Sequence, residues 1–255
     1  MAGSSLIEAR RGAYEHLYQE CKFGGYSRHD GAVHFYTRVQ SLLTGSSVVC
    51  DLGCGRGFHK MLYEGFARTV QVCRGLNRHV IGVDVDKYAT ENPYIDEFRL
   101  IGADGRLPLE DSSIDVVVSE WVFEHLEQPL RTLAEASRVL KPGGVICIRT
   151  PNRWHYSSLG ASMIPNQWHH HVRRILRQPH DPQDVFPTYY RCNSKGAMQR
   201  TLMSTGFESA VYRHRGPSHL VEAGQFLGRV GECLERLSPS AFLHEIHAFG
   251  RKMPT

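Results

Sequence analysis

The stretch that decides the fold reads Asp51-Leu52-Gly53-Cys54-Gly55-Arg56-Gly57. Its first two residues belong to an apolar run at 47–52 that is typical of a buried strand. Its last glycine begins the segment 57–68, in which apolar residues recur at helical spacing. Glycines let the backbone approach a ligand closely, and open α/β sheets bind ligands at the carboxyl ends of their strands. We therefore expect a ligand-binding loop between a strand and a helix of an α/β sheet.

The details of this loop exclude two common phosphate-binding motifs. Phe58 stands where a dinucleotide-binding fingerprint requires its third glycine, and no Gly-Lys-Ser or Gly-Lys-Thr follows, as a P-loop would need. Asp51 stands at the start of the loop, where its carboxylate would repel a pyrophosphate and attract a cation. The loop favours a ligand with an ammonium and a sulfonium group over one with phosphates.

Strand and helix patterns alternate along the rest of the chain. Further strands are expected at 79–84, 98–103, 114–119, 145–150, 209–214 and 243–249, and helices at 6–21, 33–43, 194–204 and 225–236, with another beginning near Pro129. The central strands lack strict polar alternation, which is typical of a mostly parallel sheet with helices on both faces. The fold class is therefore α/β.

Two further acids follow neighbouring strands. Asp84 ends the strand at 79–84, where a carboxylate can accept hydrogen bonds from both hydroxyls of a ribose. Asp104 follows the strand at 98–103 and can accept from the amino group of an adenine. Together with Asp51, these acids predict a site for adenosine with a positively charged tail.

The motifs resemble those of class I S-adenosylmethionine-dependent methyltransferases, in the branch of the ubiquinone and menaquinone-type enzymes. The resemblance rests on residues 51–57, 82–86, 103–109, 123–126 and 138–144. It implies a Rossmann-like sheet of seven strands with the last strand antiparallel, and S-adenosylmethionine as cofactor, released as S-adenosylhomocysteine. It also implies these donor-binding residues: Asp51, Gly53, Cys54, Gly55, Asp84, Val85, Asp104, Gly105 and Glu120.

We expect one domain over residues 1–255. It divides into an N-terminal helical cap (1–45), a donor-binding core (47–151), an insertion (152–193) and a C-terminal part of the core (194–255). Methyltransferases of this shape commonly build the acceptor pocket from such an insertion and from the N-terminal helices. The acceptor-binding residues that we predict are Trp121, Trp154, His155, Tyr156 and Tyr189.

A methyl acceptor with a hydroxyl group needs a base, and His125 is the preferred candidate because imidazole titrates near neutral pH. The alternative is that His125 only binds backbone at the start of a helix. The run His169-His170-His171 suits a single metal ion poorly, since adjacent side chains point in different directions. We expect no metal.

Composition limits the partners. Lys and Arg together number 30 against 26 Asp and Glu, a small surplus for a nucleic-acid-binding protein. The basic segment 172–177 is a candidate for peripheral contact with a membrane surface, but no apolar stretch is long enough to span one. The seven cysteines show no regular spacing, so we expect a reduced, cytoplasmic protein, monomeric or homodimeric.

These observations predict methyl transfer to a small-molecule acceptor, at oxygen in the first instance, with nitrogen or carbon left open. Two alternatives remain at this stage: an RNA-modifying methyltransferase, and a non-catalytic partner protein that keeps the fold.

Overall fold

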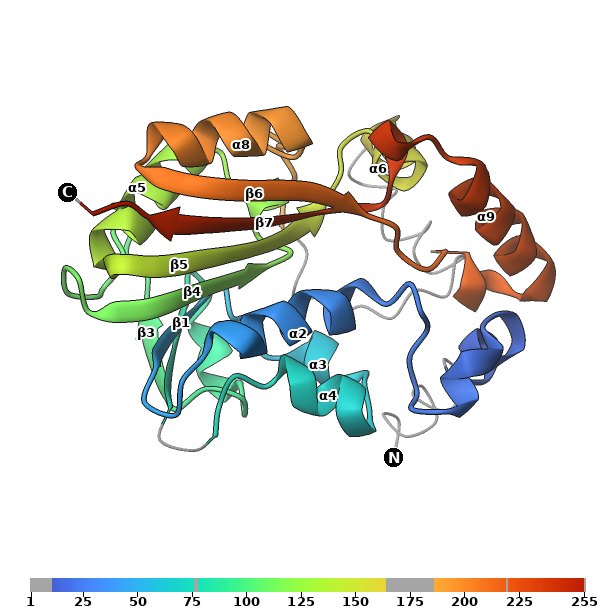
Figure 1. Cartoon of the computed structure of the whole chain (residues 1–255), viewed down its shortest axis with the longest axis horizontal. Coiled ribbons are helices and arrows are strands. Elements are labelled where there is room, and N and C mark those ends of the chain that lie inside the picture. Colours follow the sequence, from blue (N-terminus) through green and yellow to red (C-terminus); the bar gives the residue numbers. More distant parts are fainter. Residues whose placement is uncertain (1–10, 76–77, 164–185, 219, 255) are drawn as a thin grey trace.

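The computed structural model describes residues 11–75, 78–163, 186–218 and 220–254, and its centre is one seven-stranded sheet (Figure 1). In chain order, the strands are β1 (Val48–Leu52), β2 (His79–Asp84), β3 (Glu97–Leu100), β4 (Ile114–Glu120), β5 (Leu140–Pro151), β6 (Phe207–His214) and β7 (Glu245–Lys252). The spatial order is β3-β2-β1-β4-β5-β7-β6, and β7 alone runs antiparallel to its neighbours. The predicted seven-stranded, mostly parallel sheet with an antiparallel last strand is confirmed.

Helices cover both faces of the sheet (Figure 1). On one face lie α2 (Gly31–Leu42), α3 (Phe58–Met61) and α4 (Gly65–Gln71), and on the other lie α5 (Pro129–Val139) and α8 (Lys195–Ser204). Each face has its own apolar core because neighbouring residues of a strand point to opposite sides: Cys50 packs in one cluster and Val49 in the other.

A third group of elements gathers beyond the carboxyl ends of the parallel strands (Figure 1). It contains α6 (Tyr156–Met163), α9 (Gln225–Leu237) and the N-terminal segment, in which residues 11–17 are helical. Short 3₁₀ turns complete the chain: η1 (Gln19–Lys22), η2 (Lys87–Glu91), η3 (Phe123–His125), η4 (Val221–Ala223) and η5 (Ser240–Phe242). Tyr18 and Cys21 form a small core with Val221, which joins the N-terminal segment to the C-terminal part.

The single helix expected over 57–68 is wrong, because the chain breaks it into α3 and α4. The break occurs at residues 62–64, and Gly65 adopts a φ of +53°. Arg68 stabilises the break, since its guanidinium donates to the carbonyls of Tyr63 and Met61 that a continuous helix would have used. The apolar spacing was compatible with both arrangements.

Gly31 at the start of α2 marks the closest approach of this helix to β7. A Cβ atom on Gly31 would lie 1.5 Å from Oε1 of Glu245, and the Glu245 carboxylate is fully buried. The side chain of Asp30 caps the helix by accepting from Val33 N. Only glycine at position 31 lets α2 lie against the end of β7.

We expect Gly31→Ala to lower the free energy of unfolding by about 1–3 kcal/mol, the usual cost of overpacking a buried site. The matched control is Gly45→Ala, because a Cβ atom there meets no atom within 4 Å and the residue is exposed. Urea unfolding of both variants measures the effect. Equal stability of the two variants would show that α2 can shift away from Glu245 without cost.

Candidate functional site

The glycine loop after β1 has the conformation that its sequence predicts. Gly53, Gly55 and Gly57 adopt φ values of +70°, +47° and +76°, which side chains other than glycine rarely adopt. A Cβ atom on Gly53 would lie 2.3 Å from Val122, whereas one on Gly55 would meet no atom within 4 Å. The loop therefore packs tightly on the end of β4 and leaves open space above Gly55.

Asn92 holds this loop from outside it, and sequence reasoning missed this residue. Its buried side-chain amide donates to the carbonyls of Cys54, at 2.8 Å, and Gly55, at 3.1 Å. Its Oδ1 accepts from Tyr94 N at 2.9 Å, which fixes the amide. Because Asn92 lies 38 residues beyond Cys54, nothing in the local spacing pointed to it.

Asp84 lies against the same loop, as its position at the end of β2 predicts. Oδ2 accepts from Gly55 N and Oδ1 from Asp86 N, each at 2.9 Å. Burial raises the pKa of Asp84, and the backbone N–H groups of Asp86 and Gly55 oppose that rise. A carboxylate has about four acceptor positions, so these N–H groups leave capacity for a ligand hydroxyl.

The remaining adenosine-side residues are more exposed. Asp104 follows β3, and its Oδ1 accepts from Arg106 N at 3.2 Å. Val85 and Gly105 are exposed as well. Because β1, β2 and β3 are parallel neighbours, Asp51, Asp84 and Asp104 all lie at the same edge of the sheet.

Asp51 already has a cationic partner inside the protein. Nζ of Lys60, in α3, lies 2.8 Å from Oδ2 of Asp51, and both side chains are buried. The rings of Tyr36 and Tyr94 flank the ammonium, each with its centroid 6.0 Å from Nζ. The sequence did not predict a role for Lys60, because a single lysine in a helical pattern is usually exposed to solvent.

Glu120 at the end of β4 belongs to a buried ionic network. Its Oε2 accepts from the Tyr36 hydroxyl at 3.0 Å, and its Oε1 pairs with Arg149 of β5. Arg149 also pairs with Glu245 of β7, Nη2 to Oε2 at 2.7 Å. The guanidinium lies 4.9 Å from the centroid of Trp121, a residue with a φ of +56° that is unusual outside glycine. Glu120 and Trp121 thus lie together beside the glycine loop.

Two candidate proton acceptors follow in η3. Nδ1 of His125 lies 2.8 Å from the carbonyl oxygen of Pro187, so the neutral ring donates from Nδ1 and carries its lone pair on Nε2. The buried carboxylate of Glu124 accepts from Thr150 Oγ1 at 2.9 Å, and burial raises the pKa of Glu124 to about 7. Both residues belong to the segment 123–126, which carries part of the family resemblance.

The predicted acceptor-binding residues have different surroundings. The backbone N–H of Tyr189 donates to the Glu124 carbonyl at 2.7 Å, which places it beside η3. His155 is fully buried, and its Nε2 contacts Oε1 of Glu235 at 2.8 Å. The Tyr156 ring packs on the His155 ring, with 4.1 Å between their centroids. The Trp154 side chain is 46% exposed, and the Arg153 guanidinium packs over its ring. His155 thus packs against α9, and its ring also contacts His244, whose ring lies 5.9 Å from that of Trp121. His169–His171 and the segment 172–177 lie outside the described residues.

A cleft of about 320 Å³ opens between the N-terminal segment and the α3–α4 connection. Its aromatic lining comes from Tyr14, Tyr26, Tyr63 and Phe66, and the glycine loop does not contribute to it. Tyr63 is close enough to Arg149 to influence its charge electrostatically. Tyr63 is thus the lining residue that links the cleft electrostatically to the ionic network.

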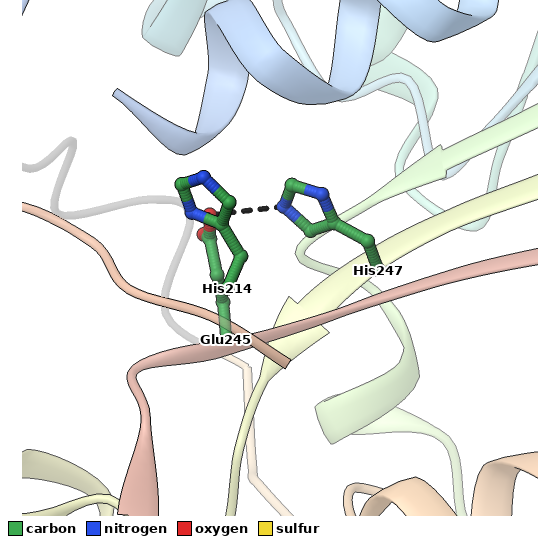
Figure 2. A group of neighbouring side chains, drawn as sticks. All are labelled: His214, Glu245 and His247. Carbon is green, nitrogen blue, oxygen red and sulfur yellow. Dashed lines mark hydrogen bonds and ion pairs between the residues drawn. The ribbon is translucent and has the colours of Figure 1, made fainter. Parts of the chain in front are cut away.

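At the other end of the network, His214 and His247 meet the buried carboxylate of Glu245 (Figure 2). Oε1 of Glu245 lies 3.0 Å from Nε2 of His247 and 3.3 Å from Nδ1 of His214. Each residue offers one atom that could bind a metal ion, and these three atoms lie within 4.8 Å of one another. The two rings stack with 4° between their planes, and Arg149 occupies Oε2. A guanidinium beside the carboxylate disfavours a second cation. We therefore interpret the cluster as two stacked histidines on one carboxylate, with His247 hydrogen-bonded to it, rather than as a metal centre.

This cluster predicts a loss of stability in mild acid. Burial lowers the pKa of His247 below its usual 6.5, despite the opposing effect of Glu245. The unfolded chain therefore takes up a proton near pH 6.5 that the folded chain does not, and stability falls as the pH drops from 7 toward 5, by up to about 1.4 kcal/mol per pH unit. Burial alone would raise the pKa of Glu245, but Arg149, His214 and His247 hold it well below 4.5, so its contribution is lost only at lower pH.

His247→Phe should flatten this pH dependence, since the ring already lies among Phe35, Tyr212 and Phe249. The measurement is the free energy of urea unfolding at pH 5, 6 and 7, with the exposed His79→Gln as the control. An unchanged slope in His247→Phe would assign the pH dependence to other groups.

Comparison with known proteins agrees with this geometry. Residues 50–148 match the methyltransferase domain family. A probable S-adenosylmethionine-dependent methyltransferase of Mycolicibacterium smegmatis is 35% identical over 127 residues, which cover 48% of this chain and 44% of that protein. A ubiquinone biosynthesis O-methyltransferase of Burkholderia vietnamiensis is 28% identical over 135 residues (49% and 56%), and a human thiol S-methyltransferase is 35% identical over 109 residues (41% and 43%).

The chain thus spans about half the length of the curated relatives that it matches. Among solved structures, a SAM-dependent methyltransferase from Archaeoglobus fulgidus has the same fold, with a TM-score of 0.56, 20% identity, and coverage of 94% of this chain and all of that one. Taken with the glycine loop and the acids beside it, these matches show that residues 50–148 are a methyltransferase domain of the class I, S-adenosylmethionine-dependent type.

Proposed function

We propose that the protein transfers a methyl group from S-adenosylmethionine to a small-molecule acceptor. The observation that carries the proposal is the hydrogen bond between Gly55 N and Asp84, which joins the glycine loop to the acid expected to bind the ribose. The open space above Gly55 fits a ligand that lies on the loop. Asp51 at the end of β1 and Asp104 after β3 extend this surface in the two directions that an adenosine with an amino-acid tail requires.

We further propose oxygen as the first acceptor atom to test and sulfur as the second. The relatives named above act at different atoms, one as an O-methyltransferase and one as a thiol S-methyltransferase. The aromatic cleft beside the N-terminal segment is large enough for a small organic acceptor, which prefers a mainly apolar pocket. We therefore propose this cleft as the place where the acceptor enters.

In this mechanism the donor supplies a methyl group already activated on a sulfonium. The chain has to align the acceptor for in-line attack and to remove its proton. Nε2 of His125 is the proposed proton acceptor, with Pro187 fixing the ring through Nδ1. Glu124, whose pKa is about 7, is the second group in η3 suited to hold that proton.

Partners and location are proposals as well. Among the described residues, no helix is long and apolar enough to cross a membrane. The seven cysteines are all free thiols, and six are buried, which supports the proposed reduced, cytoplasmic environment. One solved neighbour is a complex between the Haloferax volcanii Trm112 methyltransferase activator and a methyltransferase, so we also propose testing for an activating protein.

Asp84→Ala should weaken the binding of S-adenosylhomocysteine by about 30-fold, or about 2 kcal/mol, because two charge-assisted hydrogen bonds to the ribose are lost. Isothermal calorimetry measures the affinity. The control is Asp111→Asn, which removes an exposed carboxylate paired with Arg138 and should leave the affinity unchanged. Wild-type affinity in Asp84→Ala would contradict the assignment of the donor site.

His125→Ala should reduce methyl transfer by about 100-fold or more and leave the affinity for S-adenosylhomocysteine unchanged, as expected for the loss of a general base. The assay uses tritiated S-adenosylmethionine with phenols, carboxylic acids, thiols and RNA as acceptors. Transfer to RNA alone, with steep salt dependence, would overturn the proposed small-molecule acceptor. Tight donor binding without transfer to any acceptor would instead favour the non-catalytic partner.

A further inference from the structure

Lys60 is a buried cation in α3, only three residues after the last glycine of the loop. Its side chain is 10% exposed, and its ammonium lies 2.8 Å from the Asp51 carboxylate. A lysine in this environment is costly unless its charge and its N–H donors are all matched. The Asp51 carboxylate neutralises the charge, but the N–H donors of the ammonium also need hydrogen-bond acceptors.

An ammonium has three N–H donors, and the described residues occupy one of them. Within the described part of the chain, Oδ2 of Asp51 is the hydrogen-bond acceptor that Lys60 Nζ contacts. The rings of Tyr36 and Tyr94 flank Nζ at 6.0 Å and attract its charge through their faces, but they offer no carboxylate or carbonyl oxygen there. The other two N–H donors therefore have no acceptor among the described residues, at a position next to Asp51.

Asp51 has complementary capacity. Oδ2 is bound to Lys60, and Oδ1 accepts no hydrogen bond from the described residues. The pair therefore presents ammonium donors next to a carboxylate acceptor. A free α-amino acid group has the opposite pattern, because its carboxylate only accepts and its ammonium only donates.

We propose that Lys60 binds the carboxylate of the donor's amino-acid end while Asp51 binds its ammonium. The inference rests on the proposed function, since it needs a donor that carries this group. It explains how a loop preceded by a carboxylate tolerates the negative charge of the donor's own carboxylate, which Asp51 alone would repel.

The charge state of the lysine suits this role. Burial alone would lower the pKa of Lys60, but Asp51 raises it above its usual value, so the group stays cationic through neutral pH. Glu120 lies close enough to contribute to the same shift. Lys60 is thus a fixed positive charge at an edge where carboxylates outnumber cations.

The test separates carboxylate recognition from structural pairing by changing the ligand as well as the protein. S-adenosylhomocysteine is compared with S-adenosyl-3-thiopropylamine, which keeps the adenosine, the sulfur and the ammonium but lacks the carboxylate. Calorimetry on the full chain gives both dissociation constants. We expect the wild type to prefer S-adenosylhomocysteine by about 10- to 100-fold, the range for a charge-assisted hydrogen bond.

In Lys60→Met we expect this preference to fall to about 1, with the amine analogue bound as tightly as by the wild type. Lys141→Met is the matched control, because Lys141 also pairs with an aspartate, Asp115, at 2.8 Å, and its loss should leave the preference intact. If Lys60→Met fails to fold because Asp51 is left unpaired, the double variant Lys60→Met with Asp51→Asn restores neutrality. It should likewise show no preference.

The outcomes are distinguishable. A wild type that binds neither ligand contradicts the proposed function itself. A wild type that binds both ligands equally, or a Lys60→Met variant that keeps the preference, overturns the role of Lys60 and leaves the donor assignment in place. Lys60→Arg should retain a preference above 1, because a guanidinium also binds a carboxylate.

Discussion

The carboxyl edge of the sheet depends on one buried guanidinium. Arg149 of β5 pairs with Glu120 of β4 on one side and with Glu245 of β7 on the other, and its side chain is 7% exposed. Three neighbouring strands are thereby joined at the edge where the glycine loop lies. Removing the arginine would leave two buried carboxylates without their cation, a cost of about 3–5 kcal/mol for one broken pair.

This network also determines how the N-terminal part covers the sheet. Tyr36 of α2 donates to Glu120, and Gly31 at the start of the same helix lies directly against Glu245. The helix thus contacts both acids that hold Arg149. At this edge, the three carboxylates Asp51, Glu120 and Glu245 face two cations, Lys60 and Arg149. This excess of negative charge favours the binding of a sulfonium ligand and disfavours the binding of a phosphate ligand.

The contacts that could be predicted from the sequence are those between residues close together along the chain. The glycine loop and Asp84 were predictable because their roles depend on local features: positive φ angles, a strand end and a motif of seven residues. Asn92 and the pairing of Arg149 with Glu245 were not, because these contacts join residues 38 and 96 positions apart. His155 illustrates the same limit. It was predicted from its aromatic neighbours, but its buried contact with Glu235 of α9, 80 residues away, had no local signal.

The same distinction separates the proposed donor side of the site from the proposed acceptor side. The proposed donor side consists of main-chain contacts of the loop and of pairs close in sequence, such as Asp51 with Lys60. A chain with the same motifs is therefore expected to form a similar surface. The acceptor side depends on long-range contacts, such as His125 with Pro187, 62 residues away. Such contacts can change without disturbing the glycine loop. Relatives that share residues 50–148 can therefore keep one methyl donor while their acceptors differ, and the identity of the acceptor has to be sought in the segments that meet η3 and the aromatic cleft.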